Sequence, residues 1–166
     1  MLFRSYLKII SDKTASLLST CCQIGAASVT ADEGIIGRMR EFGENVGMVF
    51  QIRDDLLDYV GRKSITGKPT GLDMKEKKLT LPLIHSMSQA PRTQTKAIMK
   101  IIKNGASKKE LQSLVEFTHE FGGIDYTTKK AEEYSARASE ALQTLPYSPA
   151  KESLMSFVDY VLERSK

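Results

Sequence analysis

The 166-residue sequence predicts an all-α fold. Apolar residues recur at three- and four-residue spacing over long segments, as on the buried face of a helix. Runs of Val, Ile and Thr with strict alternation, which mark strands, are missing. Glycine and proline clusters fall between the periodic segments. The length is that of one ordinary domain, so we expect residues 1–166 to form a single all-helical unit.

The expected helices follow one another with short breaks. Asp32 is placed to cap the second of them, and Pro82 suits the first turn of the third. Between these two, recurring glycines and Pro69 predict a loop over residues 61–71. Helices are expected at residues 3–29, 33–59, 79–89, 92–103, 108–120, 123–144 and 148–164.

Composition is that of a globular protein, with 41% hydrophobic and 27% charged residues. No apolar run approaches the roughly 18 residues of a membrane span, and the first residues lack the apolar core of a signal peptide. We therefore expect no transmembrane segment. Cys21 and Cys22 are adjacent, which suits neither a disulfide framework nor a metal pair and indicates a reduced, cytoplasmic setting.

Three carboxylates, Asp54, Asp55 and Asp58, interrupt an otherwise apolar segment. At about 100° per residue they share an arc about 100° wide with Gln51, and the opposite side is apolar. Asp54 and Asp58 repel each other by a few tenths of a kcal/mol. An oxygen-only set suits a hard cation such as Mg²⁺. The pattern alone leaves a solvated acidic stripe open as the alternative.

A basic segment follows these carboxylates and accounts for the net charge of +4. A basic loop after an acidic helix favours a phosphate site over a nucleic-acid face, because no stacking aromatic residues are interleaved with the lysines. Between positions 62 and 78, six basic residues and two acidic residues, Asp73 and Glu76, give a net charge of +4. The basic residues are Arg62, Lys63, Lys68, Lys75, Lys77 and Lys78.

Some single residues admit two interpretations. Lys13 lies on an apolar stripe, so it either snorkels to the surface or holds an anion at the rim of a pocket. Gly43 and Gly47 share the arc of the carboxylates and indicate space for a cavity above them. Arg53 lies on the apolar arc, where we expect an acidic partner. His85 and His119 are interpreted as structural residues.

Four segments together resemble the carboxy-terminal half of trans-type isoprenyl (polyprenyl) diphosphate synthases in order and spacing. The resemblance covers about residues 3–90 and implies a helical bundle of the isoprenoid synthase type, of which this chain holds the second half. The segments are Lys13-Thr14-Ala15-Ser16-Leu17, Phe50-Gln51-Ile52-Arg53-Asp54-Asp55-Leu56-Leu57-Asp58, Thr66-Gly67-Lys68-Pro69-Thr70-Gly71-Leu72-Asp73 and Lys78-Leu79-Thr80-Leu81-Pro82-Leu83-Ile84.

The resemblance also implies a reaction in which an allylic diphosphate ionises and adds to isopentenyl diphosphate. The second Asp-rich motif would hold Mg²⁺ against the allylic diphosphate, lysines would contact that diphosphate, and Thr14 and Gln51 would lie beside the reacting centre. The implied metal ligands are Asp54, Asp55 and Asp58; the implied catalytic residues are Lys13, Thr14, Gln51 and Lys68; the implied diphosphate-binding residues are Lys13, Lys68 and Lys78.

The chain departs from the family pattern in one large respect. The first Asp-rich motif, with its paired arginines, and the basic region that receives isopentenyl diphosphate are absent from the 166 residues. We therefore predict that the chain alone lacks prenyltransferase activity. It would act as a homodimer or with a chain that supplies the first half.

Three other functions remain as alternatives. The first is a non-catalytic helical subunit that modulates a complete synthase, although intact motifs argue against it. The second is a class I terpene cyclase, whose second metal site normally contains Asn and Ser or Thr. Nucleic-acid binding is the least favoured. We also expect the isolated chain to oligomerise or aggregate through faces that the missing helices would cover.

Overall fold

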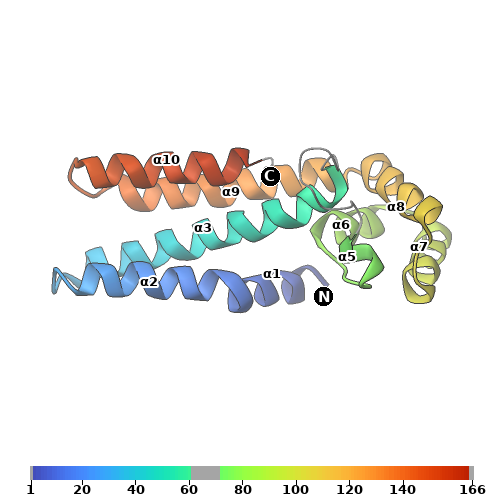
Figure 1. Cartoon of the computed structure of the whole chain (residues 1–166), viewed down its shortest axis with the longest axis horizontal. Helices are drawn as coiled ribbons and strands as arrows, with labels where there is room; N and C mark the ends of the chain where they lie inside the picture. Colours follow the sequence, from blue (N-terminus) through green and yellow to red (C-terminus); the bar gives the residue numbers. More distant parts are fainter. Residues whose placement is uncertain (1, 61–71, 165–166) are drawn as a thin grey trace. The chain divides into compact units, whose positions relative to one another are not determined.

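The computed structural model describes residues 2–60 and 72–164, and within them it contains helices and no strand, which confirms the all-α prediction (Figure 1). The helices in chain order are α1 (Leu2–Ile10), η1 (Ser11–Ala15), α2 (Ser16–Ala27), α3 (Glu33–Val60), α5 (Leu72–Lys75), α6 (Leu81–Gln89), α7 (Arg92–Asn104), α8 (Lys108–Glu120), α9 (Gly123–Gln143) and α10 (Pro149–Glu163). Among these described segments, no helix has the length and apolarity needed to cross a membrane.

Most of the predicted helix boundaries are correct to within two residues. Asp32 caps α3 as predicted, since its Oδ1 accepts the backbone N–H groups of Gly34 and Ile35 at 2.8 and 3.1 Å. The first predicted helix differs, because one π-helical turn, η1, separates α1 from α2. The short α5 was not predicted. The loop predicted at 61–71 lies outside the described residues.

The contacts divide the chain into two compact units. The first contains residues 2–6 together with the described part of 54–129, and the second contains residues 7–53 and 130–164. Each unit has its own apolar core. The expectation of one all-helical unit stays a prediction.

The core of the first unit forms where α6, α7 and α8 bury their apolar faces with the end of α3. Tyr59 in this core shares a hydrogen bond of 2.7 Å between its hydroxyl and Thr80 Oγ1. Gly123 opens α9 at a point where an added Cβ would meet the carbonyl oxygen of Pro82. The buried members are Tyr59, Met74, Leu83, Ile98, Ile102, Leu111, Leu114 and Phe117.

The core of the second unit lies among α3, α9 and α10, which run side by side (Figure 1). On another side of α3, η1 and α2 approach so closely that glycine is required. A Cβ added at Gly43 would lie 2.4 Å from the carbonyl oxygen of Leu18, and one at Gly47 would lie 2.5 Å from Ala15 Cα. The expected cavity at these glycines is therefore wrong, because the backbone of the neighbouring helix fills that space.

Gly43→Ala is expected to lower the free energy of unfolding by about 1–3 kcal/mol, because the new methyl group would collide with backbone atoms that cannot move independently. Gly37→Ala is the matched control on the same helix, since an added Cβ there has no atom within 4 Å. The control should raise stability by about 0.5–1 kcal/mol. Urea denaturation followed by circular dichroism measures both, and equal effects would contradict the packing at Gly43.

Among residues 2–60 and 72–164, no ion pair joins Arg53 to the acidic partner expected from the sequence. Its Nη2 donates a hydrogen bond of 2.8 Å to the backbone carbonyl of Arg164, at the end of α10. The Arg164 guanidinium lies over the Phe50 ring, 4.5 Å from its centroid. Burial, together with the charge of Arg164, lowers the pKa of Arg53. Arg53 therefore ties the end of α10 to α3 by capping an orphan carbonyl.

Candidate functional site

The three predicted carboxylates lie on the last turns of α3 but occupy different environments. Asp55 is only 4% exposed, whereas Asp54 and Asp58 are half-buried. Asp55 Oδ2 accepts a hydrogen bond of 2.7 Å from the hydroxyl of Tyr6, which is itself buried. Burial and the nearby Asp55 charge raise the pKa of Tyr6, so its hydroxyl stays a neutral donor. This bond holds the carboxylate of Asp55 in place.

Asp58 is positioned by the short helix α5. One of its oxygens, Oδ2, accepts the backbone N–H of Asp73 at 3.1 Å. The Asp73 carboxylate in turn lies 3.2 Å from the Nζ of Lys78. Lys78 Nζ also lies 2.6 Å from Glu76, and the hydrogen bonds to Glu76 and Asp73 raise the pKa of Lys78. Asp73 thus contacts both predicted residues. Its carboxylate pairs with Lys78, and its backbone N–H donates a hydrogen bond to Asp58.

A metal site at these carboxylates would be an open one. Within residues 2–60 and 72–164, no three His, Cys, Asp or Glu side chains gather closely enough to hold an ion among themselves. Mg²⁺ does not need such a cage, since it commonly takes one or two carboxylates and completes its shell with waters and phosphate oxygens. Asp54 and Asp58, one helical turn apart, fit that requirement. Asp55 fits less well, because one of its oxygens already binds Tyr6.

The other predicted pair belongs to the second unit. Thr14 Oγ1 donates a hydrogen bond of 2.9 Å to Gln51 Oε1, which brings together the two residues predicted beside a reacting centre. Thr14 and the exposed Lys13 both lie in η1, and π-helical turns of this kind are frequent at functional sites. The exposure of Lys13 agrees with the interpretation that its amino group reaches solvent.

The predicted residues therefore form two described groups, both involving α3. Asp54, Asp55, Asp58 and Lys78 lie in the first unit, while Lys13, Thr14 and Gln51 lie in the second. Lys68 lies outside the described residues. The roles of Tyr6 and Asp73 were not predicted from the sequence. A tyrosine in an apolar stripe was the available signal, because a buried phenol hydroxyl normally needs a polar partner.

His85 contributes to packing, as predicted. Its ring stacks on Tyr126 with 4.0 Å between centroids, and Phe3 meets both rings edge-on. Burial lowers the pKa of His85 below its ordinary value. His119 is exposed. Through these ring contacts, His85 ties α1, α6 and α9 together within the first unit.

Acidification is expected to destabilise the first unit through His85. Because its folded pKa is lowered, the unfolded chain takes up the proton first as the pH falls through the ordinary value of about 6.5, and stability is lost below that point. His85→Phe keeps the aromatic stack and should reduce the drop in Tm between about pH 7.5 and 5.5. Differential scanning calorimetry of His85→Phe and of the exposed control His119→Phe tests this. An equal reduction in both variants would contradict it.

Comparison with known proteins places these residues in a family. The profile of the family described as Polyprenyl synthetase matches residues 2–118. Geranylfarnesyl diphosphate synthase from Aeropyrum pernix is 35% identical over 163 residues, covering 97% of this chain and 50% of that protein. Heptaprenyl diphosphate synthase component 2 from Bacillus subtilis (strain 168) is 33% identical, with 97% and 45% covered.

Solved structures agree in fold. Geranylgeranyl pyrophosphate synthase from Bacteroides thetaiotaomicron matches with a TM-score of 0.86 at 37% identity, covering 96% of this chain and 52% of that one. Polyprenyl synthase from Caulobacter crescentus CB15, complexed with calcium and isoprenyl diphosphate, has a TM-score of 0.89 at 29% identity, with 97% and 49% covered. The chain thus spans about half the length of the relatives that it matches. It belongs to the polyprenyl synthetase family.

Proposed function

We propose that this chain supplies the second Asp-rich motif of a prenyltransferase that condenses isopentenyl diphosphate with an allylic diphosphate into longer polyprenyl diphosphates. The observation that carries the proposal is the end of α3, where half-buried Asp54 and Asp58 flank an Asp55 fixed by Tyr6. The names of the Aeropyrum pernix and Caulobacter crescentus proteins support a diphosphate substrate with an isoprenoid chain.

Asp54 and Asp58 would hold Mg²⁺, with Asp55 serving mainly to fix the shape of the motif. When bound, the ion would neutralise the negative charge that develops on the departing diphosphate. The two carboxylates would hold the ion at one face of α3, and a metal held by only two carboxylates can still bind phosphate oxygens. The bond between Asp58 and the backbone of Asp73 restricts the Asp58 side chain before any ligand arrives.

Lys13, Lys68 and Lys78 would donate hydrogen bonds to diphosphate oxygens. Lysine is a compact, mobile positive charge and suits an anion whose charge increases as the bond to carbon breaks. Such contacts would strengthen in the transition state and so accelerate ionisation. Lys78 would exchange Glu76, its exposed partner at 2.6 Å, for the diphosphate. Thr14, bonded to Gln51, would orient that amide beside the reacting carbon.

The proposed enzyme needs more than this chain. Because the chain spans about half of its relatives, the first Asp-rich motif would come from a complementary half, and homodimerisation is a further expectation. The Bacillus subtilis relative is named as a component, which supports action with a partner. The alternative is a non-catalytic subunit that modulates a complete synthase. Such a subunit would have no need for two acidic residues, Asp54 and Asp58, one helical turn apart. The cytoplasmic setting stays a prediction.

Isothermal titration with geranyl diphosphate tests the proposal on the chain itself. Binding is expected in Mg²⁺ and not in EDTA, because the carboxylates and the diphosphate would otherwise repel each other. Asp54→Asn should weaken Mg²⁺-dependent binding at least tenfold, on the order of the losses seen when metal-site groups are removed. Asp125→Asn, an exposed acid on α9, is the matched control. Binding that is indifferent to Mg²⁺ or to Asp54 would refute the proposal.

A further inference from the structure

Helix α7 carries a continuous row of positive charge. Its four basic residues Arg92, Lys96, Lys100 and Lys103, here called the α7 basic stripe, are all exposed. Their spacings of four, four and three residues confine them to an arc of about 80° at 100° per residue. The helix sequence RTQTKAIMKIIKN contains no acidic residue. The stripe is therefore not neutralised from within its own helix.

The opposite side of α7 fixes the direction of the stripe. Ile98 and Ile102 are buried in the core of the first unit, and Ile101 packs against it. Rotation of the helix would expose these isoleucines, so the basic face must stay outward. In the described part of the chain, none of the recorded ion pairs includes a residue of α7. The stripe thus presents a fixed positive face to its surroundings.

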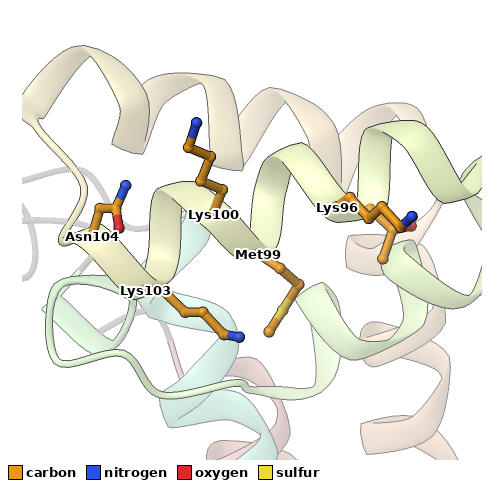
Figure 2. A pocket seen from close by; sticks show the side chains of 6 residues that line it. Lys96, Met99, Lys100, Lys103 and Asn104 are labelled. Atoms are coloured by element: carbon orange, nitrogen blue, oxygen red, sulfur yellow. The ribbon is translucent and has the colours of Figure 1, made fainter.

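The shape of this face favours a spread of negative charge over one small anion. A shallow groove of about 320 Å³ runs along α7. Its lining residues are Thr95, Lys96, Met99, Lys100, Lys103 and Asn104. In Figure 2 the amino groups of Lys96, Lys100 and Lys103 point in different directions, with Met99 between Lys96 and Lys103. A phosphate would be met by several converging donors. Diverging lysines instead suit negative charge that is spread over a surface.

The chemistry of the face favours lipid over protein. Protein interfaces are built around apolar or aromatic anchors and are depleted in lysine. The large exposed hydrophobic residues in residues 2–60 and 72–164 include none from α7. Faces that bind single-stranded nucleic acid add aromatic residues for stacking, and α7 has none. Clusters of four or more Lys and Arg on an amphipathic helix are typical of binding to anionic lipids.

We propose that the α7 basic stripe docks this chain on the surface of an anionic lipid bilayer. The attraction is electrostatic and peripheral, and it does not depend on the proposed reaction. Each basic residue held at such a surface strengthens partitioning about fivefold. Loss of the three lysines should therefore weaken vesicle binding about a hundredfold, and salt should weaken it too, since the Debye length is about 8 Å at physiological ionic strength.

Vesicle co-sedimentation tests the proposal with the full 166-residue chain. The vesicles contain either phosphatidylcholine alone or phosphatidylcholine with about 30% phosphatidylglycerol, a content that gives a strongly negative surface. The stripe variant carries Lys96→Gln, Lys100→Gln and Lys103→Gln. The control variant carries Lys8→Gln, Arg40→Gln and Lys129→Gln, three exposed positions on other helices with the same change in net charge. Circular dichroism checks that both variants fold.

The unmodified chain and the control should sediment with the anionic vesicles, and the stripe variant should stay in solution. Neutral vesicles should bind none of the three. Equal losses in the stripe and control variants would show that only net charge matters and would overturn the proposal. Failure of the unmodified chain to bind, or stripe-dependent binding to a DNA duplex without vesicle binding, would overturn it as well.

Discussion

Asp54→Asn is expected to lower prenyl transfer by at least about a hundredfold in a protein that joins this chain to the half of the Aeropyrum pernix synthase that it does not cover. Asparagine keeps the size of the side chain but removes the charge that would hold the metal. Charge developing on the departing diphosphate would then lose its main stabilisation. Turnover is measured by incorporation of radiolabelled isopentenyl diphosphate in Mg²⁺.

The matched control for that assay is Asp125→Asn, which alters an exposed acid in the first turn of α9. Its turnover should stay within a factor of two of the parent, because surface substitutions seldom shift stability by more than about 0.5 kcal/mol. Asp54 would have no metal role if its variant retained activity within a few-fold while the helical signal stayed unchanged. Loss of helix in the Asp54 variant is checked by circular dichroism.

Tyr6→Phe is expected to lower the free energy of unfolding by about 2–3 kcal/mol, because it removes the donor from a buried carboxylate. Tyr6 and Asp55 are 49 positions apart in sequence, and their bond of 2.7 Å connects α1 to the end of α3. Urea denaturation measures the change. Tyr147→Phe is the control, since its hydroxyl donates to Glu152 at an exposed site and should contribute under about 0.5 kcal/mol.

A double-mutant cycle separates this bond from a general packing defect. Combined with Asp55→Asn, Tyr6→Phe should have a markedly smaller effect than it has alone, because the charged acceptor that needs the donor is then gone. Strict additivity of the two substitutions would show that Tyr6 and Asp55 do not interact in solution. The Tyr6 variant should also weaken Mg²⁺-dependent binding of geranyl diphosphate by less than Asp54→Asn does.

Local features of the fold could be predicted from the sequence because their causes are local. Asp32 is followed by an apolar-periodic segment, and it caps α3. Pro82 falls in the first turn of α6, where a missing N–H is harmless. The π turn at Ser11–Ala15 has no comparable signal, since one extra residue in a turn leaves the composition of the helix unchanged.

Features that depend on a distant neighbour could not be predicted. Gly43 and Gly47 share the arc of the carboxylates. A small residue can either leave a cavity or allow a neighbouring backbone to approach, and only the positions of η1 and α2 show that the second is the case. Arg53 gave no sign that a carbonyl 111 positions away would accept its hydrogen bond. The proposed site residues were predicted from the order and spacing of short segments along the chain, which are local properties, whereas their partners Tyr6 and Asp73 depend on the fold.

A condensation assay on the 166-residue chain alone tests the central claim most directly, namely that this chain carries one half of a metal and diphosphate site. The assay supplies isopentenyl diphosphate, geranyl diphosphate and Mg²⁺, first to the chain alone and then to the chain joined to the complementary half of the Aeropyrum pernix relative. We expect no product above background in the first case and polyprenyl diphosphate in the second. Product formation by the chain alone would contradict the claim.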